Sequence, residues 1–317
     1  MREKIVLLYE DNNGKILCDV ASRVLTAVSL SFGHTFVVSV KCCRDEEMDD
    51  ATLDACMEAD AILAASDQML CLDSLSAELY SNCRVRDLRY DHLIDNRSLM
   101  GKNKPLNAVV VQALEAEEAA LLCAAKAGFA LAAQENLPLR PVPPSGKLQD
   151  DWQKTMESAA DVQVLSEEIS LPDVIPSVIY APEEAGVLLC PPYAGMVLTP
   201  ALTALCGAPA MAYDRYLGGQ CPLYVALSSH ESVRGDEVNP FGLLRAVQQL
   251  LRDDLKLELE AGCVEAAMRN VLQAGWRSPD IASMGLPQLG AGSMAELLCQ
   301  QIEVAGEWVN SDQTTER

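Results

Sequence analysis

The amino-acid sequence predicts an α/β fold in which a mixed parallel and antiparallel sheet is flanked by helices. Over the first 65 residues, short apolar runs typical of buried strands alternate with segments of helical apolar spacing. Aromatic residues make up only 5% of the 317-residue chain, so the core must be built from Ala, Leu and Val. Such a core favours helices packed on sheets over an all-β sandwich, and the length suits two core-forming units.

The N-terminal segments show this alternation most clearly. Ile5–Tyr9 is short and apolar, as a buried strand is, and the turn at 11–14 supplies a helix start. Apolar residues recur at helical spacing from Ile16 to Leu30. The next expected elements are a strand over Thr35–Val40, a helix over Asp49–Glu58 and a strand over Ala61–Ala65.

The remaining elements follow the same reasoning. Asn107–Gln112 is expected to be a buried strand, and the Ala/Leu-rich segment Glu115–Gln134 a long helix. Asn239 is a suitable cap and Pro240 a suitable first residue for a helix that runs to Arg252. The other expected elements are a helix over Trp152–Ala160, a strand over Val187–Cys190, helices over Leu259–Ala274 and Ser293–Val304, and a frayed polar tail from Asn310.

The run from Gly186 to Tyr213 contains no charged residue, although the formal net charge of the chain is −22. A membrane span, a buried core and the floor of a cleft all fit such a run. Four prolines interrupt it and its flanks lack Lys and Arg anchors, which argues against a membrane helix. The sequence therefore favours a buried strand, Gly186–Cys190, followed by a loop and a packed helix.

Charge and cysteine usage exclude several classes of function. A chain this acidic, with no Lys/Arg cluster, is not expected to bind nucleic acid or an anionic membrane. The twelve cysteines form no CxxC pair and there are only three histidines, so a zinc site is not expected. The N-terminal apolar run is too short for a signal peptide, and we expect a reducing, cytoplasmic location.

Several segments resemble, in the right order, the isocitrate/isopropylmalate dehydrogenase family. Asn239-Pro240, Gly275-Trp-Arg-Ser-Pro-Asp-Ile281 and Gly292-Ser-Met-Ala-Glu-Leu-Leu298 are similar to the family's ANP, GYRTxDI and GTxEMGDAI segments. The opening Ile5–Gly14 resembles its first strand and GDGIGPE loop, and Asp60–Ala65 the strand before its GAVG loop. The uncharged run resembles DVIVTxNLFGDILSDxA, so the resemblance covers nearly the whole chain.

This resemblance implies a two-domain, homodimeric fold. The nucleotide-side domain would comprise residues 1–85 and 222–317, and the middle domain, 86–221, would carry the dimerisation helices. The helix over Glu115–Gln134 and the helix after Pro200 are the expected interface elements, because small side chains allow helices to approach closely. A related dehydrogenase subunit is the alternative partner.

The family's chemistry uses a Mg²⁺ or Mn²⁺ ion that carboxylates hold against a 2-hydroxy acid. Two of the metal carboxylates fall at Met196 and Pro200 of this chain, and a third matches Asp173. A thioether and a pyrrolidine ring cannot hold a hard dication, so the resemblance predicts that Mg²⁺ and Mn²⁺ are absent.

The family's proton-transfer and substrate-clamping residues are also displaced. The segment that carries its catalytic lysine falls at 143–146, with Lys147 close by, and its tyrosine loop is missing, which leaves Tyr90 as a relocated tyrosine. Its substrate arginine becomes Gln112. Nearby arginines either clamp a substrate anion from shifted positions or form a solvated, ion-paired strand edge: Arg84, Arg86 and Arg89.

The nucleotide side is better preserved. The segment Ser229–Pro240 resembles the family's nucleotide loop, shortened, and implies that NAD or NADP is bound. His230 and Asn239 fall on family positions, while Arg234 is placed to meet a phosphate and Asp236 an adenine ribose. The structural alternatives are a simple loop histidine at His230 and a helix start at Asn239.

Two functions follow. The first is a degenerate family member that lacks oxidative decarboxylation and serves as a homodimeric, partner or regulatory subunit that senses a ligand. The second is an active NAD(P)-dependent dehydrogenase of another 2-hydroxy acid. Its relocated groups would be Lys147, Asp173, Tyr90, His92 and the three arginines.

Overall fold

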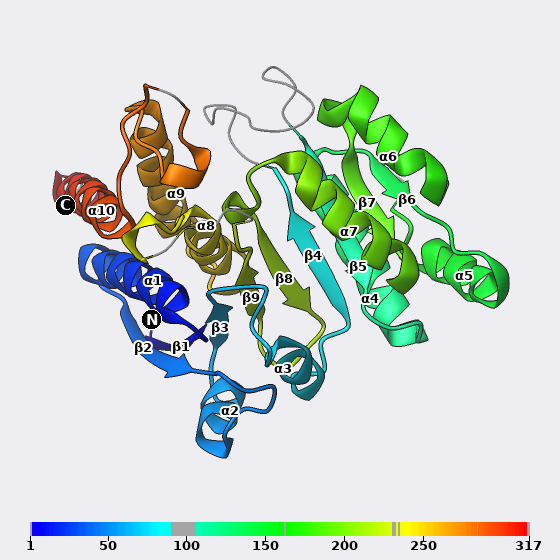
Figure 1. Cartoon of the computed structure of the whole chain (residues 1–317), viewed down its shortest axis with the longest axis horizontal. Helices are drawn as coiled ribbons and strands as arrows, with labels where there is room; N and C mark the ends of the chain where they lie inside the picture. Colours follow the sequence, from blue (N-terminus) through cyan, green and yellow to red (C-terminus); the bar gives the residue numbers. More distant parts are fainter. Residues whose placement is uncertain are drawn as a thin grey trace. The chain divides into compact units, whose positions relative to one another are not determined.

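A computed structural model describes residues 2–89, 106–161, 163–229, 233, 235–283 and 285–315 (Figure 1). The chain divides into two compact units, of which the first contains Met1–Leu75 and Cys221–Arg317 and the second contains the described residues between 76 and 220. Helix α3, Leu72–Glu78, spans the point where the chain passes from the first unit to the second. The domain boundaries expected from the sequence stay predictions.

The first unit has four parallel strands in the order β2-β1-β3-β9. Helix α1 starts where the Asp11 carboxylate accepts a hydrogen bond from the Gly14 amide at 2.7 Å. It ends at Gly33, whose φ of 73° is the left-handed conformation that glycine adopts without strain. The elements are β1 (Arg2–Tyr9), α1 (Asn12–Phe32), β2 (Thr35–Cys42), α2 (Asp50–Met57), β3 (Ala61–Ala64), β9 (Leu223–Ala226), α8 (Phe241–Gln249), α9 (Glu258–Gln273) and α10 (Ala291–Thr315).

The second unit has five strands in the order β8-β4-β5-β7-β6. Strand β4 runs antiparallel to both β8 and β5, whereas β5, β7 and β6 are parallel to one another. Together with the parallel strands of the first unit, this confirms the mixed sheet that the sequence predicted. The elements are β4 (Cys83–Asp87), β5 (Ala108–Ala113), α4 (Glu118–Glu135), β6 (Leu139–Pro141), α5 (Gln149–Ala159), α6 (Leu171–Tyr180), β7 (Gly186–Cys190), α7 (Pro192–Cys206) and β8 (Tyr213–Leu217).

The uncharged run forms strand β7 and helix α7, which follows the strand almost directly instead of after a loop. All five residues of β7 are buried, and the inner face of α7 packs on β5. Among the described residues, no helix is long and apolar enough to cross a membrane. The interpretation as buried core is therefore the right one for most of this run.

Three other expectations need correction. Strand β4 is not a solvated edge, because it pairs with a strand on each side. Helix α8 ends at Gln249 and passes into a π-helical turn, Leu250–Asp254, where the Tyr224 hydroxyl donates to Asp254 at 2.6 Å. Helix α10 continues to Thr315, beyond the point at which the sequence predicted fraying.

Candidate functional site

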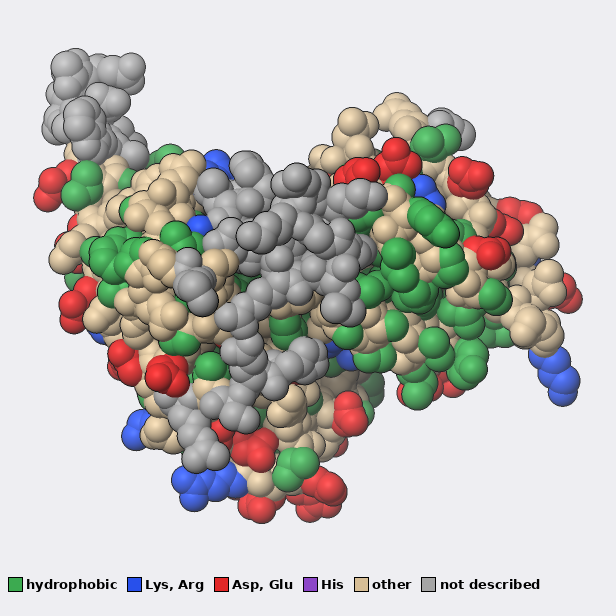
Figure 2. All heavy atoms as spheres, turned by 45° about the horizontal axis from the view of Figure 1, so that its top comes forward, with side chains coloured by type: hydrophobic (Ala, Val, Ile, Leu, Met, Phe, Trp, Pro, Cys, Tyr) green, Lys and Arg blue, Asp and Glu red, His purple; other side chains and the backbone are tan. Residues whose placement is uncertain are grey.

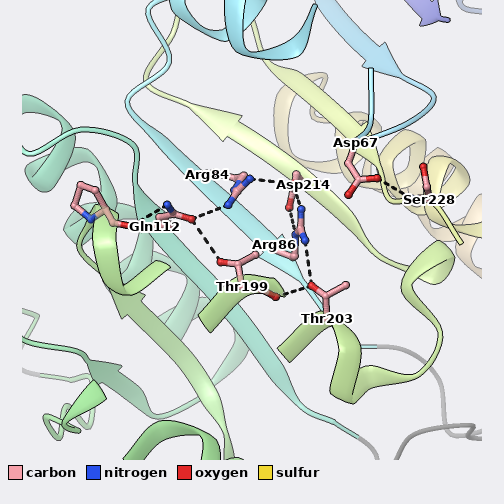
Figure 3. Close-up of polar contacts among 9 residues, drawn as sticks. Asp67, Arg84, Arg86, Gln112, Thr199, Thr203, Asp214 and Ser228 are labelled. Atoms are coloured by element: carbon pink, nitrogen blue, oxygen red, sulfur yellow. Dashed lines mark hydrogen bonds and ion pairs between the residues drawn. The ribbon is translucent and has the colours of Figure 1, made fainter. Parts of the chain in front are cut away.

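The second unit holds a buried polar cluster between strand β4 and helix α7 (Figure 3). Arg86 lies in the middle of β4, directly opposite Asp214 of β8. The Nε and Nη2 atoms of Arg86 each donate to one oxygen of the Asp214 carboxylate at 2.6 Å, and its Nη1 donates to the Thr203 hydroxyl at 3.1 Å. Arg86 and Asp214 are 7% and 1% exposed, so their charges are almost completely removed from water and stabilise each other there.

Arg84 points to the same face of β4, two residues earlier. Its Nη2 donates to the Gln112 side-chain oxygen on β5 at 2.7 Å, and its Nη1 lies 3.8 Å from Asp214 (Figure 3). The Gln112 amide donates in turn to the Pro192 carbonyl at 3.2 Å. The Nε of Arg84 is buried and has no hydrogen-bond partner among the described residues. Arg84 is therefore held by a hydrogen bond and a longer ion pair, whereas Arg86 is held in a two-pronged ion pair.

Gly195 is the reason that Gln112 fits under α7. A Cβ atom at Gly195 would lie 2.2 Å from the Gln112 Cγ, closer than any real contact. Thr199 and Thr203, one and two turns along the same helix, face the cluster, and Thr199 reaches the Gln112 oxygen at 3.5 Å. Helix α7 thus turns a small and weakly polar face toward the arginines.

Arg89, the third predicted anion-binding arginine, does not join Arg84 and Arg86. It pairs with Asp87 at 2.9 Å and with Glu135 of α4 at 3.2 Å. Burial alone would lower the pKa of Arg89, but the Asp87 charge and hydrogen bonds to it raise that pKa instead. Arg89 therefore carries its positive charge, and the carboxylates of Asp87 and Glu135 already balance that charge.

The other predicted catalytic residues lie on separate elements. Lys147 is exposed in a 3₁₀ turn, Gly146–Leu148, and Asp173 is exposed in the first turn of α6, where it accepts a hydrogen bond from the Ser170 hydroxyl. Tyr90 and His92 lie outside the described residues. A constellation that joins Lys147 and Asp173 to the arginines is not formed within the described part of the second unit.

The positions at which the resemblance puts metal carboxylates do not fit a dication. Met196 is 68% exposed on α7, and Pro200 lies exposed one turn later on the same helix. Hard cations such as Mg²⁺ require several oxygen ligands. Within the described ranges, no three His, Cys, Asp or Glu side chains gather closely enough to hold a metal ion.

In the first unit, the predicted cofactor-binding residues serve the local backbone. The Asp236 carboxylate accepts from the Gly292 amide at 2.7 Å, at the start of α10. The Asn239 side chain accepts from the Phe241 amide at 2.9 Å and donates to Asp280 at 3.0 Å. The N-cap residue of α8 is Pro240, so Asn239 lies one position before the cap that the sequence predicted for it. His230 and Arg234 lie outside the described residues. Asn239 is buried and is held by local hydrogen bonds, whereas Asp236 is exposed.

A second polar group in the first unit lies where strands β3 and β9 end. The hydroxyls of Ser66 and Ser228 are 2.7 Å apart. Asp67 accepts from the Ser228 amide at 2.9 Å, a contact drawn in Figure 3. These strands are parallel neighbours, and ligands of open α/β sheets bind beyond the carboxyl ends of such strands. Sequence reasoning missed this group, although each serine directly follows an apolar strand.

Sequence reasoning also missed Asp214, the partner of Arg86. The signal was present, because Asp214 is an isolated acid that directly follows the uncharged run. The pairing of Asp214 with Arg86 could not be predicted from the sequence, because strands β4 and β8 bring together residues that are 128 positions apart.

Comparison with known proteins gives one consistent result. The family model for isocitrate/isopropylmalate dehydrogenase matches residues 125–298, more than half of the chain. A 3-isopropylmalate dehydrogenase of Synechococcus sp. (strain CC9605) is 24% identical over 95% of this chain and 99% of its own length. One of Halalkalibacterium halodurans is also 24% identical, over 96% of this chain and 99% of its own length.

The solved structures agree on the fold. Isocitrate dehydrogenase from Methylococcus capsulatus superposes with a TM-score of 0.75 over 95% of this chain and 99% of its own, at 16% identity. The TT0538 protein from Thermus thermophilus gives a TM-score of 0.78 over 95% of this chain and 68% of its own, at 14% identity. The isopropylmalate dehydrogenase-like fold that the sequence predicted is confirmed. With a matching family model, matching relatives and a shared fold over almost its full length, this chain belongs to the isocitrate/isopropylmalate dehydrogenase family.

Proposed function

We propose that this chain is a degenerate member of its family, which lacks metal-dependent oxidative decarboxylation and acts as a homodimeric or partner subunit that senses a ligand. The observation that supports this most directly is the pairing of Arg86 with Asp214. A guanidinium whose donors are taken by a buried carboxylate cannot also clamp a substrate carboxylate, unless the ion pair breaks at a large desolvation cost.

The metal-site positions support the same conclusion. Met196 and Pro200 offer no oxygen ligand, and the one matching carboxylate, Asp173, is bonded to Ser170. Removal of a single proton-transfer or charge-stabilising group usually lowers a rate by about 10²- to 10⁴-fold. The joint displacement of the metal ligands, the lysine and the arginines would lower it by many orders of magnitude.

An exposed apolar face on helices α6 and α7 supports a subunit role. Tyr193, Met196 and Val197 are 72%, 68% and 45% exposed on α7, and Ile179 and Tyr180 are 46% and 80% exposed on α6. Figure 2 shows hydrophobic side chains gathered over this part of the second unit. We propose that a second copy, or a related dehydrogenase subunit, covers this face.

Helix α4, the other interface element expected from the sequence, supports this role less well. Its small residues, among them Ala124, Ala125 and Gly128, are buried in the core of its own unit. A charged residue on α7 is therefore the sharper test of assembly. We expect Val197→Glu to convert a dimer to a monomer in sedimentation analysis, while Ala130→Glu, at an exposed position on α4, leaves the dimer intact. A wild-type monomer would contradict the proposal.

The chemistry of the chain supports the remaining parts of the proposal. A net charge of −22 favours a protein or small-molecule partner over nucleic acid or an anionic membrane. All twelve cysteines are free, as expected for the cytoplasm. For the sensed ligand we propose NAD or NADP, at the carboxyl ends of the first unit's strands, where Ser66 and Ser228 lie.

The second candidate is an active NAD(P)-dependent dehydrogenase of a 2-hydroxy acid. The observation that favours it is the near-complete coverage of relatives named 3-isopropylmalate dehydrogenase. Lys147, Asp173 and Tyr90 would then carry proton transfer, with Arg84 as the substrate-binding arginine because it is not held in a two-pronged ion pair as Arg86 is.

Reduction of NAD⁺ or NADP⁺, followed by absorbance, separates the two candidates. The substrates are 3-isopropylmalate, isocitrate and a set of simpler 2-hydroxy acids, each with Mn²⁺ and with a chelator. The first candidate predicts no turnover and a rise in the unfolding temperature with NADH. Turnover that the chelator and Lys147→Met both abolish, with Lys154→Met as an unaffected control, would establish the second candidate instead.

A further inference from the structure

Two thiols of the second unit lie against each other. Cys83, the first residue of β4, and Cys123, on α4, have their sulfur atoms 3.5 Å apart. Cys83 is fully buried, whereas Cys123 is only partly buried, so Cys123 is the residue of the pair that a small reagent can approach. The two residues therefore differ in the way that an attacking and a resolving cysteine differ.

The distance is suited to a disulfide. A disulfide bond is about 2.05 Å long, so the sulfurs need to approach by about 1.5 Å. Helix α4 already packs on β4 in the shared core, which brings the two backbones together without help from a bond. Side-chain rotation with a small shift of α4 would close the gap.

The hydrogen bond between the thiols shifts the pKa values of Cys123 and Cys83 in opposite directions. It lowers the pKa of Cys123 to about 7, against the effect of burial, and Lys126 one turn later lowers it further. The same bond, together with burial, raises the pKa of Cys83, which keeps its proton. Of the two residues, the partly buried Cys123 is therefore the one that forms a thiolate more readily, and Cys83 keeps its proton.

We propose that Cys83 and Cys123 form a redox modification site, in which a peroxide converts the two thiols into a reversible disulfide. The Cys123 thiolate attacks one peroxide oxygen, the O–O bond breaks, and the released hydroxide takes a proton to give water and a Cys123 sulfenic acid. The Cys83 sulfur then attacks the Cys123 sulfur, the S–O bond breaks, and hydroxide leaves as a second water with the Cys83 proton. The pair loses two electrons, the peroxide gains them, and a dithiol reductant reverses the change.

A second thiol pair in the first unit provides an internal comparison. Cys43 and Cys71 are hydrogen-bonded to each other, but they are only 5% and 0% exposed. Neither sulfur is accessible to a reagent in the folded protein. If contact between two thiols were sufficient for disulfide formation, both pairs would oxidise. If an accessible thiolate is also required, only Cys83 and Cys123 of these two pairs should oxidise.

Peptide mapping of the full-length protein tests the proposal. The folded protein is treated with hydrogen peroxide, remaining thiols are blocked with N-ethylmaleimide, and trypsin and chymotrypsin are added together. Cleavage after Tyr80 and Arg84 isolates Cys83, and cleavage after Leu122 and Lys126 isolates Cys123. We expect the two peptides to be joined, with a loss of two hydrogen atoms, and to separate after treatment with dithiothreitol.

Two variants sharpen the result. In Cys83→Ser, the Cys123 sulfenic acid should persist and react with dimedone, since no resolving thiol remains. Cys299→Ser, which removes another partly buried cysteine, should leave the Cys83–Cys123 link unchanged. The proposal is overturned if wild-type Cys123 stays reduced, is oxidised beyond the sulfenic acid without a link, or pairs with another cysteine. The wild-type map decides this even if Cys83→Ser does not fold.

Discussion

Strands β3 and β4 are both interior strands, but β3 consists of apolar residues whereas β4 carries several charged ones. The four residues of β3, Ala61–Ala64, are apolar and 0% exposed, so its side chains require nothing but close packing. Strand β4 carries Arg84, Arg86 and Asp87, all of them largely or fully buried. Each of these needs a polar partner, because an unpaired buried charge is strongly destabilising.

The carboxylates at helix starts in the first unit differ in the same way from the buried carboxylates of the second. In the first unit, Asp11, Asp49 and Asp236 each accept from the backbone at a helix start and thereby stabilise local structure. In the second unit, Asp214 and Asp87 accept from guanidinium groups instead. A buried ion pair adds little stability over an apolar pair of similar volume. The buried pair of Arg86 and Asp214 therefore supports our proposal that an anion-binding region of the family fold has become internally neutralised. The first unit also buries charged side chains, and each of these is hydrogen-bonded within that unit: Glu260, Arg277 and Asp280.

The largest expected effect comes from removal of one member of this ion pair. Asp214→Ala leaves Arg86 charged and buried, and we expect the free energy of unfolding to fall by about 3–5 kcal/mol. Urea denaturation followed by circular dichroism measures the loss. The double variant Arg86→Met with Asp214→Leu should recover most of it, because no unpaired charge remains. A fall of less than about 1 kcal/mol in Asp214→Ala would mean that the pair is hydrated.

The next largest effect on the free energy of unfolding is expected from replacing one glycine in each unit by alanine. Gly195→Ala would force a Cβ to within 2.2 Å of the Gln112 side chain, and we expect a loss of about 1–3 kcal/mol in unfolding free energy. Gly262 lies in helix α9 with nothing near its Cβ position, so Gly262→Ala should instead stabilise the protein by up to about 1 kcal/mol.

A second substitution shows whether Gln112 is the cause. Gly195→Ala combined with Gln112→Ala removes the clash and should be more stable than the sum of the two single changes predicts. If the loss of unfolding free energy in the double variant equals the sum of the two single losses, the clash of the Gly195→Ala methyl group is not with Gln112.

A smaller effect concerns thiol reactivity. Because its pKa is lowered to about 7, alkylation of Cys123 by iodoacetamide should rise between about pH 6 and pH 8 and then level off. Burial and Glu260 raise the pKa of Cys263, a partly buried cysteine of the first unit, so its rate should still be rising at about pH 9. At pH 7 we expect Cys123 to react about 5- to 10-fold faster, since the lower nucleophilicity of its thiolate offsets part of its larger abundance. Peptide mapping after short labelling gives both rates, and equal rates would contradict the role of the Cys83 hydrogen bond.

Much of the fold was predictable because it depends on local pattern. The apolar spacing of residues 16–30, the Asn239-Pro240 helix start and the short apolar strands at Ile5–Tyr9 and Asn107–Gln112 each carry their own signal. Strand β4 was misjudged as a solvated edge because closely spaced arginines are typical of a surface. Their burial depends on Asp214, Gln112 and Glu135, which lie far away in the sequence.

The candidate site was predictable only in part, for the same physical reason. The resemblance drew attention to Arg84 and Arg86, and their role in substrate binding stays a prediction, because their chemistry is set by partners across the sheet. Nothing in the local sequence near Cys83 indicates that Cys123 lies 3.5 Å away, since that contact is made by the packing of α4 on β4. Pairings between distant segments determine what a charged or nucleophilic side chain can do, and a single sequence does not record them.

The smallest expected effect is the removal of an ion pair from the first unit. Lys4 and Glu58 form a contact of 3.1 Å, but their side chains are 58% and 73% exposed. Water and salt screen such a pair, so Glu58→Gln should change the free energy of unfolding by no more than about 0.5 kcal/mol. Urea denaturation at low and at high salt measures it, and added salt should reduce even this small difference. If Glu58→Gln instead matched Asp214→Ala, burial would not be what distinguishes the charges of the second unit, and their interpretation as a neutralised anion site would lose its physical basis.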